Sequence, residues 1–347
     1  MFKYLTFIAI SNMIKKNKSS IIIILQFALI AALASMLLYL YISQKKTENN
    51  APQSLLSPKI CSKIDEPKSF TIFDYSPLQE DISSYIGKKG INASIYIKNL
   101  RNGATIGINA GEGYFPASLN KLPVAIMIME RIENGELSFE TMINITDEDR
   151  RNTSGDLYKI KEKQLPLRLV LEKMLKDSDN TAFYALLNYI DTDNLKIIMD
   201  YFGADIYANY HTKTLSLPNN KKFLSPRLMS NIFSSLYFST VLEPQDSQYI
   251  LSLMTETAFD IKKEANLPDK VIVSQKFGQY YLDDNKYFHS CGIMYIDKSR
   301  IFYCIMTKDL PLDDAKHAVG FIVHDTYQYV VDTRTKLDKY KVYVENS

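Results

Sequence analysis

The sequence predicts an α+β fold in which strands begin and end one domain and helices fill the middle. Residues 91–100 and 104–110 alternate apolar with polar positions and flank Asn102-Gly103, a pattern typical of a β-hairpin. Segments rich in β-branched and aromatic residues return only near the C-terminal end, at 270–278, 286–297 and 300–309. We therefore expect the two early strands to join the three late ones in one five-stranded antiparallel sheet flanked by helices.

Helical periodicity predicts the elements between these strands. The first helical pattern runs from Asn120 to Glu133 and is closed by Asn134-Gly135. Further helical patterns cover residues 167–178, 180–189, 226–239, 244–257 and 313–336.

The last two strands place two of the three cysteines near each other. The expected turn between these strands is Lys298-Ser299, and this turn puts Cys291 and Cys304 diagonal to each other rather than opposite. We therefore expect both to be small buried hydrophobic residues and not a disulfide. With Cys61 they form no zinc spacing, and no His/Asp/Glu cluster has metal spacing, so we expect no metal and no cofactor.

The charge balance excludes one class of partner. The 347 residues include 41 basic and 39 acidic side chains, so a net charge of +2 gives no reason to expect nucleic-acid binding. We expect His211 and His289 to be ordinary surface or packing residues.

Residues 19–43 are almost wholly apolar and are long enough to cross a bilayer as one helix. Four lysines precede this segment and two follow it, which places the N-terminus in the cytoplasm. A cleaved signal peptide is the alternative, because Ala32-Leu33-Ala34 resembles a cleavage site, but the apolar run continues well past it. Both readings export the rest of the chain. The predicted map is a cytoplasmic N-terminus (1–18), an anchor (19–43), an extracytoplasmic linker (44–74), one domain (75–337) and a C-terminal tail (338–347).

Three short motifs lie in order along the domain: Ser118-x-x-Lys121, then Ser178-Asp179-Asn180, then Lys276-Phe277-Gly278. Each has an ordinary explanation by itself, as a helix cap, a second helix cap and a solvated strand end. Together and in this order they resemble the active-site motifs of the class A β-lactamases and of the related penicillin-recognising D,D-peptidases. The resemblance extends over most of residues 75–335. It implies a β-lactamase/transpeptidase-like fold with an all-helical lobe, and a bacterial protein at the cell membrane.

The chemistry of the first motif explains its residue types. A serine hydroxyl becomes a good nucleophile when a base takes its proton, and residues i and i+3 share one face of a helical turn. Lys121 can therefore serve Ser118 as its base if it is neutral, and Lys276 as a second ammonium group lowers its pKa. Ser178 can pass a proton toward the leaving nitrogen.

The resemblance also implies a set of substrate-binding residues. The oxyanion hole would use the N–H groups of Ser118 and Gln279. Gly278 would let the substrate lie close along the strand, and Asn180 would bind the acylamide of the substrate. Phe277 occupies the last substrate-binding position, where the family has Thr or Ser, so the hydroxyl that helps to bind a substrate carboxylate is missing.

A second departure concerns the acyl-enzyme. Class A β-lactamases have a glutamate in a loop after the Ser-Asp-Asn motif, and it activates the water that hydrolyses this intermediate. Residues 206–242 contain no Asp or Glu, although Asp205 and Glu243 flank them.

We therefore expect a membrane-anchored extracytoplasmic serine hydrolase that opens a β-lactam amide through an acyl-enzyme. The alternatives are a D,D-carboxypeptidase or peptidoglycan peptidase, and a slow-turnover sensor of β-lactams or cell wall. The expected partner is a β-lactam or a D-Ala-D-Ala-type stem peptide.

Overall fold

The computed structural model describes residues 33–36, 38–39, 54–57, 74–190, 202, 224–282 and 285–345. The chain divides into two units, Met1–Ser54 and Leu55–Ser347. In the first unit the described residues 33–36 and 38–39 are helical and exposed. Over the described part of the chain, no helix is long and apolar enough to cross a membrane. Most of the predicted anchor, residues 19–43, lies outside the described residues.

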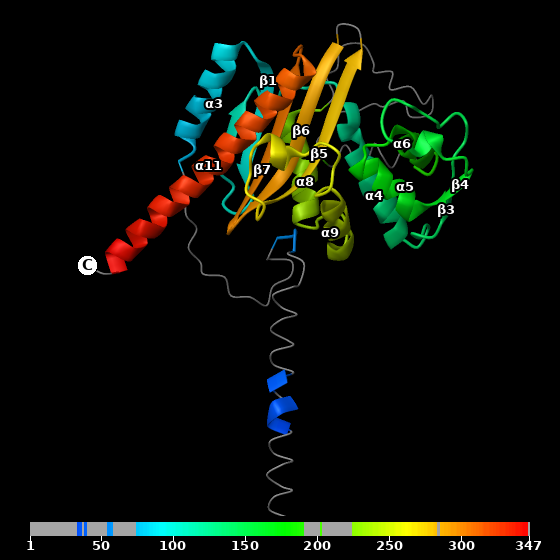
Figure 1. Ribbon diagram of the computed structural model, residues 1–347, viewed down its shortest axis with the longest axis horizontal. Coiled ribbons are helices and arrows are strands. Elements are labelled where there is room, and N and C mark those ends of the chain that lie inside the picture. The colour runs from blue at the N-terminus through cyan, green and yellow to red at the C-terminus, as the bar shows by residue number, and fades with distance from the viewer. Residues whose placement is uncertain are drawn as a thin grey trace, which may run out of the picture. The chain divides into compact units, whose positions relative to one another are not determined.

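The second unit is built on the predicted five-stranded antiparallel sheet (Figure 1). Its strand order is β2-β1-β7-β6-β5, so the strand with the Lys-Phe-Gly motif, β5, lies at one edge. The bounds are β1 Asn92–Asn99, β2 Thr105–Ile108, β5 Ile272–Leu282, β6 Asn285–Ile296 and β7 Ser299–Lys308. Gly103 in the β1–β2 turn has φ +79°, a conformation that glycine adopts without strain.

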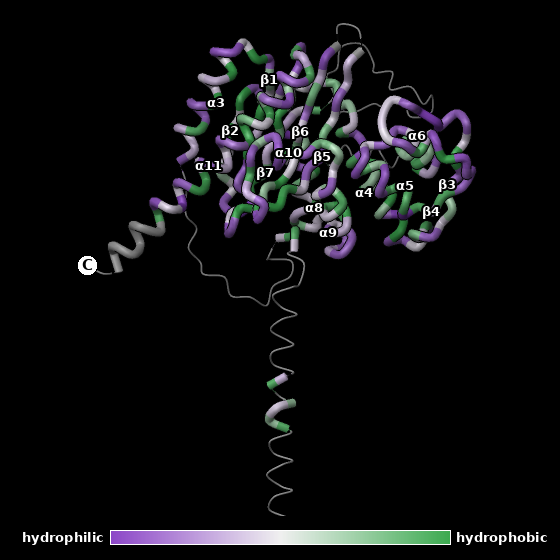
Figure 2. The backbone as a smooth tube through the Cα atoms, viewed as in Figure 1, coloured by the Kyte–Doolittle hydropathy of each residue, from purple (hydrophilic) through white to green (hydrophobic). Residues whose placement is uncertain are grey.

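Helices cover both faces of this sheet. The predicted helices are present as α4 Lys121–Glu133, α5 Leu167–Lys176, α6 Asn180–Leu187, α8 Pro226–Tyr237, α9 Pro244–Leu253 and α11 Leu312–Glu345. The sequence did not predict α3 Ser76–Lys89, the short α10 Ile261–Glu264, or the small sheet of β3 Met142–Asn144 and β4 Gln164–Pro166. In Figure 2, α3 alternates hydrophilic with hydrophobic residues, as expected for a helix with one buried face.

Two hydrophobic clusters lie on opposite faces of the sheet, because successive strand residues point to opposite sides. In β7, Phe302, Cys304 and Met306 belong to the cluster that includes α4, α5, α6, α8 and α9. Ile301, Tyr303 and Ile305 belong to the cluster that includes α3 and α11. The sequence motifs gather on the first of these faces, which we call the site face.

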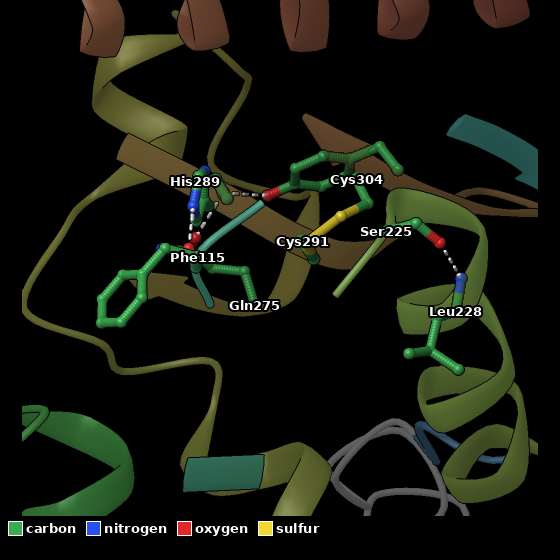
Figure 3. The surroundings of a disulfide bond; sticks show 9 residues. Phe115, Ser225, Leu228, Gln275, His289, Cys291 and Cys304 are labelled. Carbon is green, nitrogen blue, oxygen red and sulfur yellow. Dashed lines mark hydrogen bonds between the residues drawn. A yellow bond between two sulfur atoms is a disulfide. The ribbon is translucent and has the colours of Figure 1, made fainter. Parts of the chain in front are cut away.

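The two sheet cysteines form a disulfide, so the prediction that they do not was wrong. The turn between β6 and β7 is Asp297-Lys298, one residue earlier than predicted, and Ile296 pairs with Ser299. Asp297 has φ +42°, which aspartate tolerates better than most residues. This shift puts Cys291 directly opposite Cys304, with a Cα–Cα distance of 3.9 Å, and both are fully buried (Figure 3).

Two domain boundaries differ from the prediction. The helix α11 continues to Glu345 and so includes most of the predicted tail. Within the predicted linker, Leu55 and Leu56 are buried in the hydrophobic cluster of the site face. The N–H of Ser57 donates to the carbonyl of Tyr237 at 2.8 Å, and the Tyr295 hydroxyl donates to the carbonyl of Leu55 at 2.6 Å. Residues 55–57 are therefore part of the folded unit.

Candidate active site

Ser118 lies in a short 3₁₀ turn, Ala117–Asn120, that leads directly into α4. Asn120 occupies the N-cap position of α4, so Ser118 is not the cap of that helix. Lys121 is the first residue of α4, and its Nζ lies 3.0 Å from Ser118 Oγ. The turn has one unusual conformation, at Ala117, where φ is +47°. The i, i+3 spacing thus brings the predicted nucleophile and base into hydrogen-bond contact.

Lys121 is almost completely buried and is surrounded by oxygen atoms. Besides Ser118 Oγ, its Nζ contacts the carbonyl of Ser178 at 2.5 Å, Ser178 Oγ at 3.2 Å and Asn180 Oδ1 at 2.6 Å. Burial lowers the pKa of Lys121 well below its usual value, and the nearby Lys276 lowers it further, while Asp179 opposes the shift. A neutral amine has one lone pair, so Lys121 in that form can accept the proton of Ser118.

Ser178 bridges the two lysines. Its Oγ accepts from Lys276 Nζ at 2.9 Å and from Lys121 Nζ at 3.2 Å, and its φ is +55°. The next residue, Asp179, fixes this position by capping α6 and by accepting from the N–H of Leu157, with both distances 2.8 Å. The Ser-Asp-Asn motif is therefore both a helix cap and part of the site, because the capping carboxylate points into the protein and its two neighbours reach Lys121.

The side chain of Asp179 leaves no room for a side chain at residue 155. Gly155 has φ +81°, and a Cβ at this position would lie 2.0 Å from Asp179 Oδ2. A loop residue other than glycine would therefore displace the cap and the Ser178 hydroxyl with it.

Lys276 is fully buried, so it is not a solvated strand end. Besides Ser178 Oγ, its Nζ contacts the carbonyl of Phe277 at 3.1 Å. Burial lowers the pKa of Lys276 to about 7. The Phe277 ring belongs to the cluster on the opposite face, where it packs on Phe259 with ring centroids 5.8 Å apart. The ring centroid also lies 4.7 Å from Lys276 Nζ, so both the carbonyl and the ring of Phe277 contact this amine.

The edge of β5 lies directly against the Ser118 turn. A Cβ on Gly278 would lie 3.0 Å from the nitrogen of Ser118 and 3.1 Å from the carbonyl oxygen of Pro116. The N–H of Gln275 donates to Met254, away from β6, and the β5–β6 register is uninterrupted. Backbone groups alternate along an antiparallel strand, so the N–H of Gln279 points to the same free edge. The N–H of Gln279, one of the two predicted oxyanion donors, is thus at the strand edge, and Gly278 beside it approaches the nitrogen of Ser118, the other predicted donor.

Asn180 is already engaged at both ends of its amide. Its Oδ1 accepts from Lys121, and its Nδ2 donates to Thr153 Oγ1 at 2.6 Å. One N–H of Nδ2 is thus used by Thr153, and the second N–H can donate to a substrate acylamide. No sequence motif indicates Thr153, which reaches the site only because its loop passes over the start of α6.

Among the described residues, Lys121 Nζ contacts two serines and an asparagine but no carboxylate. Glu243 is exposed at the start of α9, and its N–H donates to the side chain of Glu133 at the end of α4. Asp205, His211 and residues 206–223 lie outside the described residues. The described part of the chain contains no group of three or more His, Cys, Asp or Glu side chains that could hold a metal ion.

The family model of the Beta-lactamase enzyme family matches residues 77–330, which is most of the chain. The chain belongs to this family. The curated beta-lactamase VEB-1 from Pseudomonas aeruginosa is 27% identical over 228 residues, which are 60% of this chain and 75% of that protein. The predicted resemblance to β-lactamases, a family of hydrolases, is thus confirmed.

Solved structures share the fold of this β-lactamase family member. The structure of TLA-3 extended-spectrum beta-lactamase has a TM-score of 0.67 and 16% identity, covering 74% of this chain and 100% of that one. The structure of PBP-A has a TM-score of 0.65 and 18% identity, covering 74% and 97%. A beta-lactamase from Chitinophaga pinensis DSM 2588 has a TM-score of 0.65 and 19% identity, covering 74% and 100%.

Proposed function

We propose that this chain is a serine hydrolase that opens a β-lactam amide through an acyl-enzyme on Ser118. The observation that carries the proposal is the continuous hydrogen-bonded series from Ser118 through Lys121 and Ser178 to Lys276. In this family member the series joins a nucleophile, a base whose pKa is lowered, a hydroxyl and a second amine without a gap.

The arrangement supports the following steps. Neutral Lys121 takes the proton of the Ser118 hydroxyl, and the oxygen attacks the amide carbonyl. The N–H groups of Ser118 and Gln279 bind the negative oxygen that forms. The C–N bond then breaks, and the Ser178 hydroxyl gives its proton to the leaving nitrogen and regains one from Lys121. Lys276 attracts the substrate carboxylate electrostatically, without help from a hydroxyl at residue 277.

Acylation is tested with a fluorescent penicillin. The wild-type chain is expected to become labelled, and Ser118→Ala is expected to remain unlabelled at the same protein concentration. Equal labelling of the two would contradict the proposal.

A second candidate is a slow-turnover protein, either a D,D-peptidase or a sensor that keeps its acyl group. The absence of Asp and Glu from residues 206–242 favours it, because no carboxylate in this segment can activate water. A D-Ala-D-Ala stem peptide identifies a peptidase, which releases D-Ala, whereas a sensor and a β-lactamase do not. A penicillin adduct that persists identifies a sensor, whereas one that clears identifies a β-lactamase.

The proposal also places the domain outside the cell, on a single anchor formed by residues 19–43 with the N-terminus in the cytoplasm. The lysine distribution around the segment supports this orientation. The Cys291–Cys304 disulfide supports it as well, because such bonds persist in oxidising compartments. Protease added to intact spheroplasts is expected to digest the domain, and protection of the domain would contradict the orientation.

A further inference from the structure

We propose that His289 is a positioning residue that fixes the Ser118 turn for acylation. His289 lies on β6 directly opposite Gly278 of β5, and its side chain is fully buried on the site face. Its Nε2 lies 2.8 Å from the carbonyl oxygen of Phe115, three residues before Ser118 (Figure 3). A carbonyl only accepts, so Nε2 carries the hydrogen. The inference rests on the proposed acylation of Ser118.

The turn that His289 holds cannot keep its shape by local preferences alone. Ala117 is in the left-handed region, which non-glycine residues adopt only when their surroundings impose it. Its close contacts with β5 are possible because Gly278 has no side chain. Aromatic rings restrain the turn from the outside: Phe115 packs against Tyr280 and Tyr287 with centroids 4.8 and 5.9 Å apart. The His289 hydrogen bond supplies the polar restraint from the inside.

The hydrogen bond to the Phe115 carbonyl is the contact that uses the polarity of Nε2. The second ring nitrogen, Nδ1, is buried and has no hydrogen-bond partner among the described residues. An apolar side chain would fill the same space without leaving a buried nitrogen unpaired. Burial lowers the pKa of His289 to about 4, so the ring is neutral around pH 7 and adds no charge beside the two lysines.

The consequence concerns the reacting atoms. The carbonyl of Phe115 is separated from Ser118 by Pro116 and Ala117, so freeing this carbonyl lets the nucleophile and its oxyanion N–H move together. A displacement of about 1 Å costs on the order of 100-fold in rate. Substrate binding before reaction depends less on this turn, so the effect falls on the acylation step.

Glutamine and asparagine separate positioning from packing. His289→Gln carries an amide nitrogen at about the reach of Nε2, whereas the shorter Asn in His289→Asn does not reach Phe115. Both leave a buried polar side chain, so their folding costs are matched. His289→Leu removes the hydrogen bond altogether.

The chain offers a matched control in His324 of α11, whose Nδ1 lies 2.8 Å from the carbonyl of Ala265, on the other face of the sheet. His324→Leu removes the same kind of hydrogen bond outside the site. It is expected to leave the acylation rate constant within about two-fold of wild type.

The experiment measures single-turnover acylation of the full chain by a fluorescent penicillin over a concentration series, which separates the acylation rate constant from the apparent Kd. We expect His289→Asn and His289→Leu to lower the rate constant about 10- to 100-fold at nearly unchanged Kd, and His289→Gln to recover most of it. Equal rate constants for Gln and Asn, or wild-type rates in Leu, would overturn the inference. If Leu does not fold, the Gln–Asn comparison decides. A folded wild type that is not acylated would instead remove the proposed function, and the inference with it.

Discussion

Lys276 on β5 lies directly opposite Cys291 on β6, and Cys291 is bonded to Cys304 on β7. The three side chains therefore stand in one row across the sheet, on the site face. Neighbouring side chains in such a row are in contact distance of each other. The disulfide thus fixes the strand next to the buried amine that contacts Ser178.

The first prediction concerns this disulfide. The double change Cys291→Ala, Cys304→Ala is expected to lower the free energy of unfolding by about 2–4 kcal/mol, since the bond restricts the unfolded chain. Urea denaturation measures the loss, and Cys61→Ala serves as the control that keeps the bond. Stability equal to wild type in the double variant would show that the disulfide does not contribute.

The second prediction concerns pH. Acylation needs neutral Lys121, so its rate is expected to rise with pH as Lys121 loses its proton. A positive Lys276 disfavours the charged form of Lys121 and thereby lowers its pKa. In Lys276→Met the pKa of Lys121 rises, and the acid limb of the acylation profile moves to higher pH. A limb at unchanged or lower pH would contradict the coupling of the two lysines.

The third prediction concerns Gly278. A methyl group there would lie 3.0 Å from the Ser118 nitrogen, so Gly278→Ala is expected to push the turn off β5 and lower the acylation rate at least 10-fold. Gly111→Ala is the control, because its Cβ would meet nothing within 4 Å. Stopped-flow labelling compares the two, and similar rates in both would mean that the close approach is unimportant.

The fourth prediction concerns deacylation. Without a carboxylate in residues 206–242, water lacks a positioned base, and such a base is worth about 10²–10⁴-fold in rate. We expect a burst of acylation followed by slow turnover, seen as a persistent adduct in intact-mass spectra. Thr214→Glu, at the spacing the family's loop predicts, is expected to speed the loss of the adduct. Rapid steady-state hydrolysis by the wild type would show that another group supplies the base.

The sequence predicted most of the fold because its strands and helices have strong local patterns. It also predicted that Ser118, Lys121, Ser178 and Lys276 form one site, and the structure brings these side chains into contact. The disulfide was missed because a one-residue error in the turn shifts the pairing of the two strands by two residues, so that Cys291 appears diagonal to Cys304 instead of opposite it.

Other features of the site left no local signal. His289 is one histidine in a strand, and only the register that places it opposite Gly278 shows its contact with Phe115. Thr153 comes from a loop that the sequence does not connect with α6, and its contact with Asn180 depends on tertiary structure. Phe277 was expected at the substrate by its place in the motif; its ring packs in the cluster of the other face, yet its centroid lies 4.7 Å from Lys276 Nζ.

We propose that Ser118 is a nucleophile and not an ordinary serine at the start of a helix. A second serine in the chain provides the comparison. Ser225 is the N-cap of α8, and its side chain accepts from the N–H of Leu228 at 3.2 Å (Figure 3). The most direct measurement is peptide mapping by mass spectrometry after incubation with a penicillin, on wild type, Ser118→Ala and Ser225→Ala. We predict an adduct on Ser118 in the wild type, none in Ser118→Ala, and a normal adduct in Ser225→Ala, which loses only about 0.5–2 kcal/mol of stability with its cap. An adduct on another residue, or an unchanged adduct in Ser118→Ala, would contradict the proposal.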